Sequence, residues 1–402
     1  MSETNMKNRS NKKRRRPLTE REKEILRKRR AKRKRRLLIR RILVILLILL
    51  LLVLIFLIGH ALLGNLTEDD MDSGNDNAKK STNLSIESDS SIAEETDTYP
   101  ITITVSSMGD CTLGTDENFD QSTSLPAYYN SKGPDYFFQN VRSILEEDDL
   151  SIVNFEGTLT EETARADKTF AFKADPEYTK ILTGSSVEAA NQANNHSHDY
   201  GEKSFTDTTE ALQEAGITTF GYEDTAIYEV KGVKIGLTGI YELATHEGCS
   251  EMLKENIASL KEEGADVIIV NFHWGVEKEY YPNATQVSLA HTAIDEGADL
   301  VIGHHPHVLE GVELYNGKYI AYSLGNFCFG GNKNPSDKDT MIFQMSFTIT
   351  EDGVADSTEA DMNIIPCRLS STTSCNDYCP TPLEGGEAQA VLDKIEKYSE
   401  GL

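Results

Sequence analysis

An uninterrupted apolar run at residues 42–59 constrains this chain more than any other feature of its sequence. Its 18 positions hold no charged residue and are mostly Leu, Ile and Val, and after His60 the apolar residues continue to Leu63. A helix of about 20 apolar residues spans the hydrocarbon core of a bilayer, whereas a buried helix of a globular domain usually keeps a polar face. We therefore predict one transmembrane helix over residues 42–63.

A cleavable signal peptide is the main alternative for this run. Such peptides have an apolar region of about 7 to 15 residues and end at a small-residue A-x-A site. The run here is longer, and the sequence from His60 to Asn65 offers no such site. The pattern therefore favours an uncleaved signal anchor.

The charges on the two sides of the run predict its orientation. Residues 1–41 hold 20 basic residues and four acidic ones, a charge of +16, and the rest of the chain carries −41. Because basic residues beside a membrane span stay inside, residues 1–41 are predicted to be a cytoplasmic tail and the C-terminal part to be extracytoplasmic, at the cell membrane. The tail contains no aromatic residue that could stack on bases, and topology already explains its charge, so no nucleic-acid partner is predicted.

Composition divides the remainder of the chain. Residues 64–98 are rich in Asp, Glu, Ser, Asn and Thr without apolar periodicity, which predicts a disordered acidic linker. A folded domain is expected over residues 99–367, followed by a C-terminal segment, 368–402, with a short helix at 387–398. Strand signals lie at 101–105, 150–155, 233–239, 266–272, 299–303, 319–324 and 341–350, and helical periodicity at 135–147, 203–215, 251–263 and 284–296. The alternation predicts an α/β fold.

Polar residues gather directly after these strand signals. Asp110, Glu156, Asn195, His273 and His305 follow five different strand or motif segments. Because sites of α/β proteins lie at the carboxyl ends of strands, we expect these side chains to meet. Carboxylate, amide and imidazole groups together suit a divalent Mn, Fe or Zn ion.

The ordered motifs resemble the signature of the CapA family, the poly-γ-glutamate capsule synthesis proteins. They are Gly109-Asp110, Asn154-x-Glu156-Gly157, Ala193-Asn194-Asn195-His196-x-x-Asp199-Tyr200-Gly201, His273-Trp274-Gly275-x-Glu277, Gly303-His304-His305-Pro306-His307 and Tyr322-Ser323-Leu324-Gly325-Asn326-Phe327. That family is similar to calcineurin-like metallophosphoesterases, which implies a sandwich of two sheets flanked by helices with a metal centre at its edge.

The resemblance also implies roles for single residues. The metal ligands would be Asp110, Glu156, Asn195, His273, His305 and His307. His196 would protonate the leaving group in a metal-dependent hydrolysis of a phosphoester or related bond. Residues that would support the ligands are Asn154, Asp199, Glu277, His304 and Asn326. Alternation along an extended chain would place His305 and His307 on one side and His304 on the other.

Two departures from the metallophosphoesterase pattern bear on the metal. Cys111 and Thr112 follow Asp110 where an Asp-x-His pair is usual, and Glu156 stands where that pattern has Asp. One ligand of a two-metal centre is therefore missing, and a single, weakly held metal fits the sequence.

Two classes of function remain open at the level of the sequence. The first is a membrane-anchored metal-dependent hydrolase in capsule or poly-γ-glutamate-type polymer synthesis or export. The alternative is a non-catalytic component that binds polymer within an export assembly. Either would have the membrane, an anionic cell-surface polymer and polymer synthase or export proteins as partners.

The cysteines give one further expectation. Cys367, Cys375 and Cys379 are close in sequence and predicted to be extracytoplasmic, where disulfides persist, so at least one bond among them is predicted.

Overall fold

The computed structural model describes residues 99–402. The predicted tail 1–41, transmembrane helix 42–63 and linker 64–98 lie outside the described residues. Within residues 99–402, every helix is too short or too polar to cross a bilayer.

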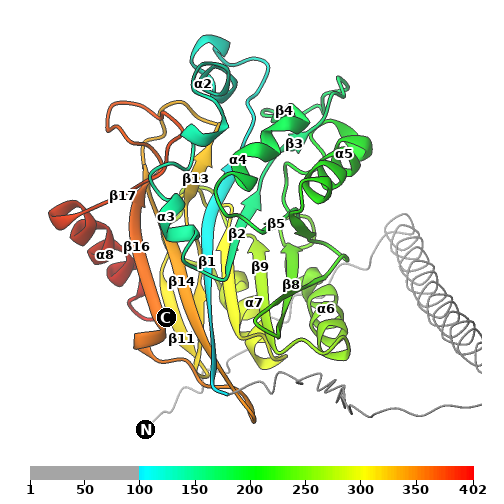
Figure 1. Cartoon of the computed structure of the whole chain (residues 1–402), viewed down its shortest axis with the longest axis vertical. Helices are drawn as coiled ribbons and strands as arrows, with labels where there is room; N and C mark the ends of the chain where they lie inside the picture. The colour runs from blue at the N-terminus through cyan, green and yellow to red at the C-terminus, as the bar shows by residue number, and fades with distance from the viewer. Residues whose placement is uncertain (1–98) are drawn as a thin grey trace, which may run out of the picture. The chain divides into compact units, whose positions relative to one another are not determined.

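Two sheets form the centre of the fold (Figure 1). The larger sheet has the order β17 (Thr381–Pro382), β16 (Met362–Arg368), β14 (Asp339–Thr350), β1 (Ile101–Thr112), β2 (Leu150–Phe155), β5 (Ala189–Asn191) and β6 (Thr218–Phe220), with β13 (Asn326–Phe329) paired to β1 and β15 (Gly353–Val354) to β14. The smaller sheet has the order β11 (Val312–Tyr315), β12 (Lys318–Ala321), β10 (Leu300–His304), β9 (Val267–His273), β8 (Val233–Tyr241) and β7 (Ala226–Val230). A short pair, β3 (Thr158–Leu159) and β4 (Lys173–Ala174), stands apart.

The two sheets pack face to face, because one buried cluster contains side chains from both. It joins Ile103 of β1 and Phe343 of β14 to Leu237 of β8 and Ile269 of β9. Helices cover the outer faces: α6 (Ser250–Glu262) and α7 (Ala284–Asp295) share a cluster with β9 and β10, and α2 (Leu125–Lys132), α4 (Thr179–Thr183) and α5 (Gly201–Glu214) cover the larger sheet. The predicted α/β fold of two sheets flanked by helices is confirmed.

The strands that carry the site form because their sequences are apolar on both faces. All six residues of β2 and all seven of β9 are buried, as expected for strands covered by a sheet on one side and helices on the other. Gly264 and Gly297, with φ of 81° and 100°, follow α6 and α7 and let the chain turn back into β9 and β10.

The predicted helix at 135–147 is wrong. Its place is taken by a 3-10 turn at Pro134–Tyr136 and a four-residue helix, α3 (Arg142–Leu145). Phe137, Phe138, Val141 and Leu145 are all buried, so the apolar spacing reflects contact with the core beneath them rather than a continuous helix.

The C-terminal segment is part of the same compact unit. β16 and β17 extend the larger sheet, and α8 (Gly385–Ser399), drawn in red in Figure 1, packs on β16 and β11. α8 contains the predicted helix at 387–398.

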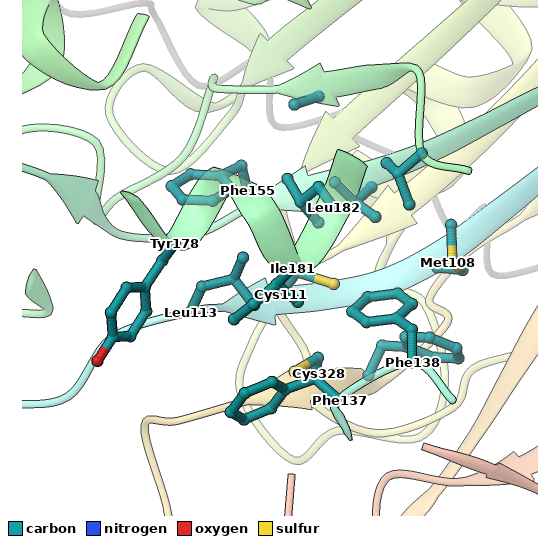
Figure 2. Close-up of a cluster of buried hydrophobic side chains, with 14 of the residues drawn as sticks. Met108, Cys111, Leu113, Phe137, Phe138, Phe155, Tyr178, Ile181, Leu182 and Cys328 are labelled. Atoms are coloured by element: carbon teal, nitrogen blue, oxygen red, sulfur yellow. The ribbon is translucent and has the colours of Figure 1, made fainter. Parts of the chain in front are cut away.

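The cysteines are free thiols throughout the described residues, so the prediction of a disulfide is wrong. Figure 2 shows Cys111 and Cys328 among the aromatic and aliphatic side chains of the core over the larger sheet. Cys367 belongs to the same cluster, and Cys379 lies against Asn140 and Tyr136. Proximity in sequence failed as a guide because Cys367 and Cys379 are buried in packing contacts, while Cys375 lies against Thr372 and Ser374.

The buried carboxyl group of Glu310 predicts that the stability of the fold depends on pH. Glu310 is fully buried; its Oε2 accepts a bond of 2.8 Å from Gln286 Nε2, while Oε1 has no hydrogen-bond partner among the described residues. Burial raises its pKa from 4.5 to about 8. The folded protein therefore keeps a proton that the unfolded chain has lost, and its stability falls as pH rises through that window.

Glu310→Gln should remove the contribution of Glu310 to this dependence, because the amide cannot titrate. Relative to wild type, the variant should gain up to about 1.4 kcal/mol in free energy of unfolding for each pH unit between roughly 5 and 8. Urea unfolding at several pH values measures the difference. Parallel pH profiles for the two proteins would show that Glu310 is ionised in the fold.

Candidate metal centre

The predicted site residues lie at the carboxyl ends of strands from both sheets. Asp110 is near the end of β1, Glu156 directly follows β2, His273 is the last residue of β9 and His305 follows β10. β1, β2 and β5 are parallel, as are β8, β9 and β10, so these ends lie at one edge of each sheet. Asn195, in the segment that follows β5, lies beside these strand ends, where it contacts His273.

Glu156 is the centre of this group. It is fully buried, and among residues 99–402 neither of its carboxyl oxygens has a hydrogen-bond partner. The Nε2 atoms of three histidines surround Oε1, at 3.7 Å for His273 and 3.9 Å for both His196 and His307. Burial raises the pKa of Glu156 to about 8. A buried carboxyl group without partners is costly, and a cation bound there would satisfy it.

His305 and His307 complete the closest set of donors. With Glu156 they form the only group of three His, Cys, Asp or Glu side chains, within the described part of the chain, whose donor atoms all lie within 4.8 Å of one another. Nδ1 of His305 is buried without a hydrogen-bond partner among these residues, and burial lowers its pKa to about 3. The imidazole is therefore neutral and can offer a lone pair.

The backbone presents both imidazoles through a turn rather than through an extended chain. The backbone angle φ is 98° at His305 and 58° at His307, values that residues other than glycine rarely adopt. The prediction that His305 and His307 lie together is confirmed. The predicted reason, alternation along an extended chain, is wrong, because the chain turns at both residues. Strain of this kind tends to persist where the surrounding structure imposes it, often at functional sites.

Asp110 orients His307. Its Oδ2 lies 3.0 Å from Nδ1 of His307, and its Oδ1 accepts a bond of 2.8 Å from Asn154 Nδ2. Burial would raise the pKa of Asp110, but the hydrogen bond and charge of His307 lower it below its usual value. Asn326 Oδ1 also lies 3.0 Å from Nδ1 of His307, so Nε2 is left to face Glu156. Burial lowers the pKa of His307, but the charges of Glu156 and Asp110 outweigh it and raise the pKa to about 9.

A second set of contacts holds His273 and Asn195 together. Nε2 of His273 is 2.8 Å from Oδ1 of Asn195, and its Nδ1 is 3.2 Å from Nδ2 of Asn154. Asn191 donates to Asn154 Oδ1 at 2.9 Å and so fixes the orientation of that amide. Burial and the neighbouring imidazoles lower the pKa of His273 well below its usual value.

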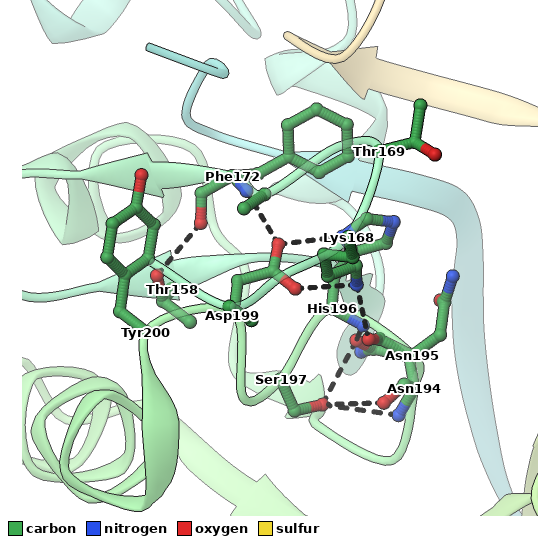
Figure 3. A network of polar contacts seen from close by, with 12 residues as sticks. Thr158, Lys168, Thr169, Phe172, Asn194, Asn195, His196, Ser197, Asp199 and Tyr200 are labelled. Atoms are coloured by element: carbon green, nitrogen blue, oxygen red, sulfur yellow. Dashed lines mark hydrogen bonds and ion pairs between the residues drawn. The ribbon is translucent and has the colours of Figure 1, made fainter. Parts of the chain in front are cut away.

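His196 is held from its Nδ1 side. Nδ1 lies 2.7 Å from Oδ2 of Asp199, and the ring of Phe172 packs against the imidazole at 4.4 Å between centroids. These contacts direct Nε2 toward Glu156. Figure 3 shows His196 and Asp199 beside Lys168, whose Nζ donates to Asp199 at 2.7 Å.

The remaining predicted residues lie around this centre. His304 is buried, with Nδ1 3.6 Å from Oδ1 of Asp110 and Nε2 3.3 Å from Oδ1 of Asn271. Glu277 is exposed on the loop after β9, and its charge contributes to the raised pKa of His307.

Lys168 and Asn191 were missed at the level of the sequence. Asn191 ends a strand too short for periodicity to reveal, and Lys168 lies in a loop that carries no motif.

The donor set fits a divalent metal. Glu156, His305 and His307 would hold the ion, with Asp110, Asn195 and His273 within the same cluster of contacts. A carboxylate with imidazoles is the kind of ligand set used for Zn, Mn or Fe. The unsatisfied oxygens of Glu156 are the observation on which this fit depends.

Comparison with known proteins gives several similar chains. The chain is 35% identical over 222 residues to "PGA biosynthesis protein CapA" of Bacillus subtilis, covering 49% of this chain and 58% of that protein. It is 34% identical over 226 residues to "Capsule biosynthesis protein CapA" of Bacillus anthracis, covering 50% and 55%. A probable polyglutamine synthesis accessory protein of Mycobacterium tuberculosis is 30% identical over 210 residues, covering 44% and 55%. The chain thus spans little more than half the length of these relatives.

Solved structures that align with the chain are more distant. A hypothetical protein from Thermus thermophilus aligns with a TM-score of 0.40 at 16% identity, covering 66% of this chain and 98% of that one. A second protein from this organism, TT1561, aligns with a TM-score of 0.38 at 10% identity, covering 60% and 94%.

The family comparison settles the membership of the chain. The model described as "Bacterial capsule synthesis protein PGA_cap" matches residues 104–331, more than half of the chain, and this region holds every predicted site residue. The match confirms the resemblance to the CapA family that the ordered motifs indicated. This chain therefore belongs to the PGA_cap family of bacterial capsule synthesis proteins.

Proposed function

We propose that this protein acts in the synthesis or export of a capsule polymer of the poly-γ-glutamate type, through a divalent-metal-dependent hydrolytic site. Family membership and the names of the relatives support the role in capsule synthesis. The single observation that carries the hydrolytic site is Glu156, whose two buried oxygens have no hydrogen-bond partner in residues 99–402 and face a ring of imidazoles.

The residues divide into a binding group and an acid. Glu156, His305 and His307 would hold the metal, and Asp110 and Asn326 fix the ring of His307 through its Nδ1. When bound, a divalent metal supplies Lewis-acid chemistry: it activates water and stabilises negative charge that develops on the substrate. Asp199 holds His196 by Nδ1, so the other ring nitrogen is the one from which a proton would pass to a leaving group.

Assays of the purified full-length protein test this proposal. We expect a divalent metal to copurify, and phosphomonoester or phosphodiester substrates to be hydrolysed faster with Mn, Fe or Zn than after chelation. Metal without turnover on any substrate would favour a binding component of a polymer export assembly. Absence of both would remove the basis for a metal centre.

We also propose that the chain crosses the membrane once, with residues 1–41 in the cytoplasm and the PGA_cap domain outside. The basic tail directly before the apolar run supports this topology. Alkaline phosphatase fused to the C-terminus should be active, and the same reporter at the N-terminus should be inactive. An externally accessible N-terminus would contradict the topology.

A further inference from the structure

The loop at residues 160–172, between β3 and β4, passes beside His196, and we name it the strap. Two buried carboxylates hold it. Asp116 accepts bonds from Arg165 at 2.8 Å and from the backbone N–H of Ala171 at 2.7 Å. Asp199 accepts from Lys168 at 2.7 Å and from the backbone N–H of Phe172 at 2.6 Å. Both carboxylates are at most 1% exposed, whereas the two cationic side chains that bind them are partly exposed.

Lys168 touches the candidate site at three points. Its Nζ donates to Oδ1 of Asp199 and, at 2.9 Å, to the backbone carbonyl of Asn195, and it lies 3.2 Å from Nδ1 of His196 (Figure 3). The other oxygen of Asp199 accepts from His196 at 2.7 Å. One carboxylate group therefore links the strap to the imidazole, and Lys168 fixes the plane of that carboxylate.

We propose that Lys168 is a positioning residue for His196. By holding Asp199 and the backbone at Asn195 in one arrangement, it sets the His196 ring with Nε2 toward Glu156. The inference rests on the proposed function only in taking His196 as the group that faces the substrate. Without the ammonium group, Asp199 keeps two donors on one oxygen and has none on the other, so the carboxylate and the imidazole that it holds can rotate.

The strap offers a matched control for this role. Lys173, the first residue of β4 directly after the strap, donates from Nζ to the carbonyl of Glu162 at 2.8 Å and lies over the ring of Tyr200 at 4.7 Å. It ties the strap down much as Lys168 does, but its contacts are with Glu162 and Tyr200. Loss of Lys173 should loosen the loop without releasing Asp199.

Histidine-selective ¹⁵N NMR of the metal-free, full-length protein provides the readout. In wild type the Nδ1–H proton of His196, assigned with H196Q, should be visible and slow to exchange because it is buried and bonded to Asp199. K168M and the shorter K168Q should each lose this signal, K173M should keep it, and K168R, whose guanidinium can reach the same carboxylate, should restore it. If the protein is a hydrolase, K168M should lower kcat about 10- to 100-fold with KM little changed.

The His196 signal in these variants shows whether Lys168 positions the ring. An unchanged His196 signal in K168M, or in K168Q if K168M does not fold, would overturn the inference. Loss of the signal in K173M as well would show that the strap as a whole, and not Lys168, positions the ring. The NMR result does not depend on turnover. Absence of hydrolytic activity would therefore contradict the proposed function without affecting this test of Lys168.

Discussion

Replacing His305 with alanine is expected to lower the affinity of the protein for a divalent metal by more than about 100-fold. Loss of residues that only support a metal ligand typically costs 10- to 100-fold, and His305 would be a ligand itself. Its Nδ1 has no other partner among the described residues, and its donor atom lies within 4.8 Å of those of Glu156 and His307. Calorimetric titration with Zn²⁺ and Mn²⁺ measures the change.

His291→Ala is the matched control for that experiment. His291 lies in α7, where it pairs with Glu313 at 2.8 Å and stacks on Tyr315. Its loss should leave metal affinity unchanged. A folded His305→Ala protein that binds metal as tightly as wild type would show that the centre lies elsewhere.

Replacing His196 with alanine should leave the metal bound but reduce turnover. A lost general acid costs roughly 10²- to 10⁴-fold in rate, and the loss should be greatest for substrates with poor leaving groups. Comparing kcat on phosphate esters of graded leaving-group pKa, together with metal content, separates this role from that of a ligand.

His198→Ala controls for the loss of an imidazole from the same segment. His198 is partly exposed and stacks on Phe205 at 4.7 Å, so its removal should leave the rate near wild type. If the protein only binds polymer, capsule output would be normal with either His196→Ala or His305→Ala, provided that the variants fold.

Part of the fold could be predicted because strands that are buried on both faces have short, nearly continuous apolar sequences. β2, β8, β9 and β10 are short runs of apolar residues, and Gly264 and Gly297 mark the returns from the helices into two of them. Once such strands are parallel, their carboxyl ends must share an edge, so residues scattered from Asp110 to His307 could be grouped before any coordinates were known.

Other features depend on tertiary contacts that leave no local pattern. The apolar spacing at 135–147 matches a helix, yet its side chains are buried by an irregular turn. Lys168 lies in an aperiodic loop and meets Asp199 only because β5 and the strap are brought together by the fold. The positive φ values at His305 and His307 likewise could not be foreseen, since neither residue favours that conformation.

The most direct test of the metal centre is anomalous X-ray diffraction from crystals of the protein grown with Mn²⁺. We expect an anomalous peak bounded by the carboxyl group of Glu156 and the imidazoles of His305 and His307, and its loss in Glu156→Gln crystals. Glu156→Gln is the sharpest comparison, because the amide preserves the shape of the side chain while removing the charge. A map without a peak at this site, from protein that binds Mn²⁺ in solution, would show that Glu156, His305 and His307 do not hold the metal.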